Sequence, residues 1–411
     1  MMTRAFAIAL LASTLVACAG AMQQPPTDAA VGVAPGVEVL LTDSLHLIRG
    51  KRVGLITNHS GRDRKGTSTI DLLYRAPGVR LTALFGPEHG LRGVAKAGES
   101  VTSTTDSATG VPIYSLYGET NAPTPEMLRD VDVLLYDIQD VGARVYTYEW
   151  TMALSAAAAG KLGKKFIVLD RPDPIRGDRV DGGVLDPRFR SFVGQYPVAL
   201  RYGLTPGELL RYLVGTAQVV ADIAVVPMRG WRRSMWWDET GILWVNPSPN
   251  LRSLDATLLY PGTVFFEGTN ATEGRGTDKP FQLIGAEWLA DAGAIAREMN
   301  ALGLPGVRFD STSRTIEAGG GYKFSGKTIP MIGISVTNRN AVRSVEVGVR
   351  LLRAIYLHHR ADWQWRPSIE RLAGTDELRT AVEQGTIDAL LAKWQRESAD
   401  WQTQTRKYWI Y

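Results

Sequence analysis

Residues 131–170 read VDVLLYDIQDVGARVYTYEWTMALSAAAAGKLGKKFIVLD, and this stretch decides the fold class. Val131 to Asp137 is a short apolar run of the kind found in buried strands, and Lys165 to Asp170 is a second one. Between them, Tyr146 to Lys161 has the length and pattern of a helix. A strand, a helix and a second strand in this order predict two parallel strands of one sheet.

The same alternation continues on both sides of this stretch. Further strands are predicted at Arg52 to Thr57, Arg80 to Phe85 and Ile223 to Val226. Further helices are predicted at Thr67 to Arg75 and Thr205 to Val214, and in the second Thr205 and Glu208 can form a capping box. The repeated alternation predicts an α/β fold with a doubly wound, mostly parallel sheet.

A second, smaller α/β domain is predicted for residues 281–411, after a main domain at 37–280. Its predicted elements are helices at about Glu287 to Leu302, Ser344 to His359, Asp376 to Gln384 and Thr386 to Arg396, and strands at Val307 to Asp310 and Met331 to Thr337. Between the domains, Asn246 to Pro280 is dense in Gly and Pro. This composition predicts a connection without regular structure that helps to build a site.

The N-terminal residues resemble an export signal with a lipid attachment site. Residues 1–17 combine Arg4 with an apolar stretch too short for a permanent membrane helix. Leu15-Val16-Ala17-Cys18 resembles a bacterial lipobox, and Cys18 is the only cysteine of the chain. We expect lipidation at Cys18, a flexible tether over residues 18–36 and, in a Gram-negative host, an outer-membrane lipoprotein that faces the periplasm. The alternative is a plain secretory signal with an incidental cysteine.

Composition excludes several classes of function. With 45% hydrophobic and 21% charged residues the chain is typical of a globular enzyme, and a net charge of +4 without a long basic run argues against a nucleic-acid partner. No HxH or HExxH pair occurs, so we predict no metal site. The sequence also lacks a GxSxG motif, which argues against a serine hydrolase. The Gly-rich segment 265–277 lacks the Gly-Lys-Ser/Thr ending of a phosphate loop, and we predict no cofactor.

Polar motifs follow four of the predicted strands. They are TNHSG at 57–61, FGPEHG at 85–90, YDIQDVGAR at 136–144 and LDRPDP at 169–174. Ligands of open α/β sheets bind at the carboxyl ends of the strands, so these motifs are expected to converge on one crevice.

Each motif contributes candidate residues. Glu88 and His89, between glycines, suit general acid/base catalysis, unless Glu88 only accepts loop N–H bonds and His89 only packs. The candidates for substrate binding are Asn58, His59, Asp137, Arg144, Asp170 and Arg171. For Asp137 and Arg144 the alternative is an internal ion pair, and for the LDRPDP motif it is a rigid turn.

The segment FFEGTNATEGRGT, residues 265–277, supplies the remaining candidates. Glu267, Asn270, Glu273 and Arg275 suit recognition of hydroxyl and carboxylate groups. The alternative is a well-bonded loop that clamps the two domains together.

Six strings in this order resemble the exo-β-N-acetylmuramidase (NamZ-type) family. They are GLITNHSG, LFGPEHGLRG, YDIQDVGARVYTY, LDRPDPIRGDRVDGG, WVNPSPN and YPGTVFFEGTNATEGRGTDKPFQLIGA. The resemblance implies a Rossmann-like catalytic domain with a smaller C-terminal domain, release of terminal N-acetylmuramic acid from peptidoglycan fragments, and Glu88 as the catalytic acid. One departure is Tyr202, at a position where the family pattern leads us to expect histidine.

Glycoside hydrolysis needs a second group at the anomeric carbon, and the sequence leaves its identity open. Glu273, Glu267 and Glu208 are the candidates, and the 2-acetamido group of the substrate could act instead. The lactyl carboxylate of muramic acid requires a cation, for which Arg92, Arg144, Arg171 and Arg275 are available. The competing functions are a non-catalytic muropeptide-binding lipoprotein and an exo-glycosidase for another amino sugar.

Overall fold

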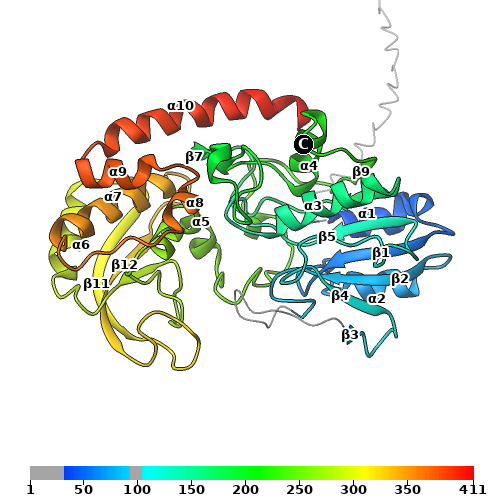
Figure 1. Cartoon of the computed structure of the whole chain (residues 1–411), viewed down its shortest axis with the longest axis horizontal. Coiled ribbons are helices and arrows are strands. Elements are labelled where there is room, and N and C mark those ends of the chain that lie inside the picture. The colour runs from blue at the N-terminus through cyan, green and yellow to red at the C-terminus, as the bar shows by residue number, and fades with distance from the viewer. Residues whose placement is uncertain (1–31, 93–103) are drawn as a thin grey trace, which may run out of the picture. The chain divides into compact units, whose positions relative to one another are not determined.

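The computed structural model describes residues 32–92 and 104–411 (Figure 1). Within these residues a seven-stranded sheet has the order β3-β4-β2-β1-β5-β6-β9. The strands are β1 Arg52–Thr57, β2 Arg80–Gly86, β3 Thr104–Thr105, β4 Pro112–Ser115, β5 Val133–Asp137, β6 Lys165–Leu169 and β9 Ile223–Val226. All neighbouring pairs are parallel except β3 with β4. The strand order reverses at β1, between β2 and β5, which opens a crevice at the carboxyl ends of these strands.

Helices cover both faces of this sheet, as the sequence predicts. Helices α1 Gly36–Asp43 and α2 Thr69–Arg75 pack on the face that carries Leu55 and Leu135. Helices α3 Tyr148–Lys161 and α4 Pro206–Gly215 pack on the face that carries Ile56 and Tyr136. Because neighbouring residues of a strand point to opposite faces, a strand buried on both sides is apolar throughout.

The C-terminal region is built on an antiparallel sheet of the order β10-β12-β11. Its strands are β10 Leu283–Gly285, β11 Val307–Thr315 and β12 Thr328–Val336. Its helices are α5 Leu254–Thr263, α6 Ala292–Ala301, α7 Ser344–His358, α8 Ile369–Ala373, α9 Glu377–Gln384 and α10 Ile387–Thr405. The hairpin of β11 and β12 is longer than predicted, since both strands continue past their apolar residues.

Two sequence predictions are corrected by the structure. Helix α5 lies inside the stretch 246–280 that was predicted to lack regular structure, and it begins with Ser253, whose side chain accepts a hydrogen bond from the N–H of Ala256. The predicted tether ends earlier than residue 36, because Val33 is buried and Ala34 pairs with Arg229. The predicted signal at residues 1–17 and Cys18 lie outside the described residues.

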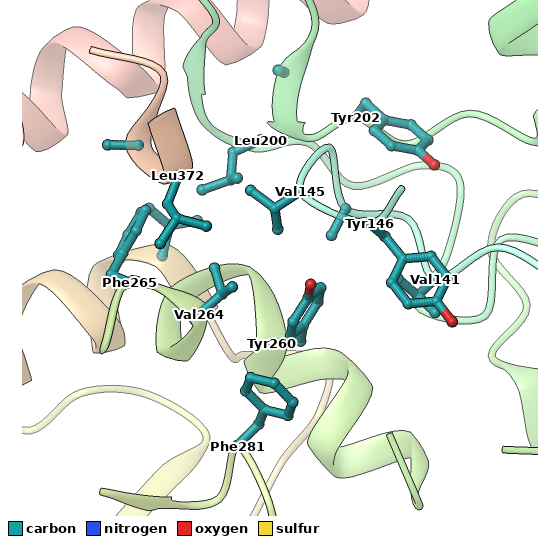
Figure 2. Packing of buried hydrophobic residues seen from close by; sticks show 14 of the residues in the cluster. Val141, Val145, Tyr146, Leu200, Tyr202, Tyr260, Val264, Phe265, Phe281 and Leu372 are labelled. Carbon is teal, nitrogen blue, oxygen red and sulfur yellow. The ribbon is translucent and has the colours of Figure 1, made fainter. Parts of the chain in front are cut away.

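The sheet region and the C-terminal region share one hydrophobic core. Figure 2 shows Val145 and Tyr146 of the first region facing Val264 and Tyr260 of the second. Helix α10, red in Figure 1, packs along the short ribbon of β7 Asp181–Val184 and β8 Ala199–Arg201. In residues 32–92 and 104–411 we find no helix long and apolar enough to cross a membrane.

Candidate active site

A cavity of about 270 Å³ lies where the two regions meet. Its walls include Glu88 and Thr147 from the sheet region and Tyr260, Glu267 and Arg275 from the segment after residue 258. Of the four strand-end motifs that were expected to converge, only FGPEHG lines this cavity. The residues that directly follow YDIQDVGAR and the segment FFEGTNATEGRGT line it as well.

Glu88 is held in a tight turn directly after β2. His89 and Gly90 both have left-handed backbone conformations, with φ of 67° and 70°. Such a φ is uncommon for a residue other than glycine, and it marks a turn imposed by its surroundings. The Thr147 hydroxyl donates a hydrogen bond of 2.8 Å to Glu88 Oε2, and the Tyr148 hydroxyl lies 3.3 Å from the Glu88 carbonyl oxygen.

The second wall carries alternating charges. Arg275 Nη2 lies 2.5 Å from Glu267 Oε1, and Arg275 Nε lies 3.3 Å from Glu273 Oε1. Lys323 Nζ lies 3.2 Å from Glu273 Oε2 and also donates to the carbonyl oxygens of Phe266 and Ala271. These contacts fix Arg275 between two carboxylates. Of the four charged residues in this group, Glu267 and Arg275 line the cavity and Glu273 and Lys323 do not.

The two carboxylates of this wall differ in their pKa values. Burial raises the pKa of Glu267, and the nearby Arg275 only partly opposes this effect. Burial acts on Glu273 too, but Lys323 and Arg275 outweigh it and lower the pKa of Glu273. Of the two, Glu267 therefore takes up a proton more readily.

Tyrosine side chains line much of the remaining surface. Tyr146 packs edge-on against both Tyr148 and Tyr260, and Tyr260 packs against Phe281. Aromatic faces with polar hydroxyls suit the apolar faces and hydroxyl groups of sugars. These tyrosines and Lys323 were not predicted as site residues. For Tyr146 and Tyr148 the available signal was the sequence VYTY, which directly follows the strand-end motif YDIQDVGAR.

Five predicted site residues are instead buried in structural contacts: Asp137, Arg171, Asp170, Glu208 and Arg144. Asp137 forms a bidentate ion pair with Arg171, with distances of 2.5 and 3.0 Å. The alternative of an internal ion pair is therefore correct for Asp137, and its partner is Arg171 and not Arg144. Asp170 accepts hydrogen bonds from Thr205 and Gly207 N, and burial next to Glu208 raises its pKa to about 7.

Glu208 and Arg144 are also structural. Glu208 completes the capping box of α4, pairs with Arg233 and accepts from the N–H of Ile410, which excludes it from the cavity. Arg144 donates to the carbonyl oxygens of Gly183, Val198 and Ala373, and its burial lowers its pKa to about 9. The Arg144 guanidinium thus binds backbone carbonyl oxygens, and the prediction that it binds a carboxylate of the substrate is wrong.

The remaining candidates hold loops near the cavity or lie away from it. Asn58 accepts hydrogen bonds from Ser60, and His59 Nε2 lies 2.7 Å from the carbonyl oxygen of Asn246, with a pKa lowered by burial. Asn270 exchanges hydrogen bonds with the backbone of residues 362 and 364. Arg92 is largely exposed and pairs with Asp106. In the part of the chain described, no group of three or more His, Cys, Asp or Glu side chains could hold a metal ion.

The fold and the cavity together define a class of protein. A doubly wound α/β region whose Glu88 lines the same small cavity as Glu267 and Arg275 has the two carboxylates that a glycoside hydrolase needs.

Comparisons with known proteins assign the family. The model of "Exo-beta-N-acetylmuramidase NamZ, N-terminal" matches residues 53–255, and that of the C-terminal part matches residues 258–411. The chain belongs to the NamZ family, which confirms the resemblance seen in the sequence. The family boundary at 255–258 falls earlier than the predicted one at residue 280 and assigns α5 to the C-terminal region.

Individual relatives cover nearly the whole chain. The peptidoglycan beta-N-acetylmuramidase NamZ of Bacillus subtilis (strain 168) is 42% identical over 382 residues, which are 92% of this chain and 91% of that protein. Two crystal structures of DUF1343 family proteins from Bacteroides fragilis NCTC 9343 are similar, with TM-scores of 0.85 and 0.74 at 34% and 28% identity. They cover 93% and 92% of this chain, and 99% of each of those chains is matched.

Proposed function

We propose that this protein is an exo-acting glycoside hydrolase that releases terminal N-acetylmuramic acid from peptidoglycan fragments. The observation that carries the proposal is the cavity of about 270 Å³ that is lined both by Glu88 and by the Glu267–Arg275 pair. This volume suits a single sugar unit, which fits removal of one terminal residue at a time.

The residues can divide the chemistry between them. Glu88 donates a proton to the glycosidic oxygen while the bond from that oxygen to the anomeric carbon breaks, with the electron pair leaving on the oxygen. Water supplies the hydroxyl group to the anomeric carbon and gives up its proton to a carboxylate of the cavity, Glu267 or the ionised Glu88. Glu267 is the candidate for the anomeric side, because Glu208 is buried elsewhere and Glu273 is held behind Arg275 by Lys323.

Arg275 is our candidate for binding the lactyl carboxylate. Among the four arginines considered from the sequence, Arg144 and Arg171 are buried in internal contacts and Arg92 is not part of the cavity wall, whereas Arg275 lines it. An arginine in a partly enclosed site can recognise a carboxylate through paired, charge-assisted hydrogen bonds.

The test is hydrolysis of a chromogenic N-acetylmuramide beside the matching N-acetylglucosaminide. We expect release from the muramide and much slower release from the glucosaminide. Binding of muropeptides without release would favour a non-catalytic binding protein instead. Faster release from the glucosaminide would assign the enzyme to another amino sugar.

We also propose that the protein is anchored in the cell envelope through a lipid on Cys18. The sequence Leu15-Val16-Ala17-Cys18 and the Ala- and Pro-rich residues after it support this proposal. Metabolic labelling with a fatty acid should mark the wild-type chain and leave Cys18→Ser unmarked. Equal labelling of both would contradict the anchor.

A further inference from the structure

Thr147 occupies the N-cap position of α3, but its hydroxyl does not cap the helix. Ser68, Thr205 and Ser253 precede α2, α4 and α5, and each accepts a hydrogen bond from a backbone N–H of its helix. Ser368 before α8 and Thr386 before α10 make no such bond, as is the case for Thr147. This interaction is the usual reason for a Ser or Thr at the N-cap. Thr147 has a helical backbone conformation, with φ of −80° and ψ of −12°, and its side chain makes no such bond.

The Thr147 hydroxyl donates to the carboxylate of Glu88 instead. Its oxygen lies 2.8 Å from Glu88 Oε2, and Thr147 is buried, with 8% of its surface exposed. The next residue, Tyr148, contacts the Glu88 carbonyl oxygen, so the start of α3 holds both the side chain and the backbone of Glu88.

Tyr117 borders the same carboxylate within the cavity. Burial, the negative charge of Glu88 and a hydrogen bond to Glu88 raise the pKa of Tyr117 to about 12. Two hydroxyl groups from separate segments therefore meet at one carboxylate, and each restricts its rotation.

We propose that Thr147 is a positioning residue for proton delivery by Glu88: its hydroxyl binds Oε2 and thereby fixes the orientation of the carboxyl group that donates the proton. This inference rests on the proposed function. A hydrogen bond to a charged or acidic group in a site of this kind contributes about tenfold to a hundredfold in rate.

The test compares Thr147→Val, which keeps the shape and removes the hydroxyl, with Thr147→Ser, which keeps the hydroxyl. Each is assayed on a disaccharide, whose sugar leaving group needs the proton, and on a dinitrophenyl N-acetylmuramide, whose leaving group does not. For Thr147→Val we expect kcat to fall about tenfold to a hundredfold on the disaccharide, with KM within about twofold, and far less on the aryl substrate. Thr147→Ser should restore most of the loss.

Two controls separate positioning from stability. Thr205→Val removes a hydroxyl that does cap its helix, and it should lower the melting temperature without changing the ratio of the two rates. In the background of Glu88→Gln, Thr147→Val should cause no further loss on the disaccharide, because the proton it helps to place is gone.

The outcomes distinguish two failures. A wild-type chain that cleaves neither substrate overturns the proposed function and this inference with it. An active wild type with equal losses on both substrates for Thr147→Val, or with no rescue by Thr147→Ser, overturns the inference alone.

Discussion

Glu88 combines the features that a general acid requires: a fixed backbone turn, a buried hydroxyl partner and a place on the cavity wall. Replacing it with glutamine keeps the size and removes the transferable proton. We expect Glu88→Gln to lower kcat on a disaccharide by about 10²–10⁴-fold, since this is the usual contribution of general acid catalysis. Turnover should be measured beside the melting temperature, which we expect to change little. Near-normal turnover would reassign the role to Glu267.

The prediction for Arg275 also concerns a single side chain, which we propose binds one carboxylate of the substrate. We expect Arg275→Gln to reduce the preference for the muramide over the glucosaminide by about tenfold to a hundredfold, through loss of charge-assisted hydrogen bonds to the lactyl group. Arg314→Gln is the matched control, because Arg314 pairs with Asp278 on the surface. An unchanged preference in Arg275→Gln would place specificity in the shape of the cavity.

Motif position indicated which residues lie near the crevice but not which way they point. Glu88, Glu267 and Arg275 were predicted as site residues and line the cavity. Asp137 and Asp170 also follow strands, yet Arg171 and Thr205 satisfy them internally. One sequence cannot separate these cases, because a buried carboxylate needs a partner and the partner comes from a distant segment.

Among the elements, α5 shows where sequence patterns mislead. Seven of the strands and most helices were predicted because apolar runs and caps are local signals, whereas the short strands β3, β4, β7, β8 and β10 were not predicted. Helix α5 was missed because Pro261 and Gly262 are both helix breakers, although they lie in its last turn. The glycine has a packing role: a Cβ on Gly262 would overlap the Ser344 carbonyl oxygen of α7.

This close approach of α5 and α7 makes Gly262 sensitive to substitution. We expect Gly262→Ala to destabilise the fold by about 1–3 kcal/mol, because the backbones of the two helices must separate. Denaturant unfolding measures the difference.

Gly293 in α6 is the control, since the atom nearest to a Cβ there would be the Ser311 hydroxyl oxygen at 3.3 Å, and this side-chain oxygen can rotate away. In a helix with room for the methyl group, alanine is favoured over glycine by up to about 1 kcal/mol. Gly293→Ala should therefore be neutral or stabilising, and equal losses in both variants would contradict the packing argument.

The stability of the whole molecule should depend on pH through His358, the last residue of α7. His358 lies 2.7 Å from Asp291 and 2.8 Å from Glu298, and His359 lies 2.6 Å from Asp291. The hydrogen bond to Glu298 and the contact with Asp291 raise the pKa of His358 above 6.5. The protonated form is thus favoured in the folded state.

A raised histidine pKa contributes stability that is complete below the unfolded value of 6.5 and is lost as pH rises through the folded value. We expect the free energy of unfolding to fall by on the order of 1 kcal/mol over that interval. The slope should be smaller in His358→Gln. An identical slope in the variant, measured by unfolding at several pH values, would assign the effect to other groups.

The cavity walls lie on both sides of the family boundary at residues 255–258: Glu88 comes before it and Glu267 and Arg275 come after it. Neither region therefore carries the reactive pair by itself. An exchange of residues 258–411 between two relatives would also break the match between Arg144 and the carbonyl oxygen of Ala373 wherever α8 sits differently. We therefore expect the two regions to form this cavity only as a matched pair.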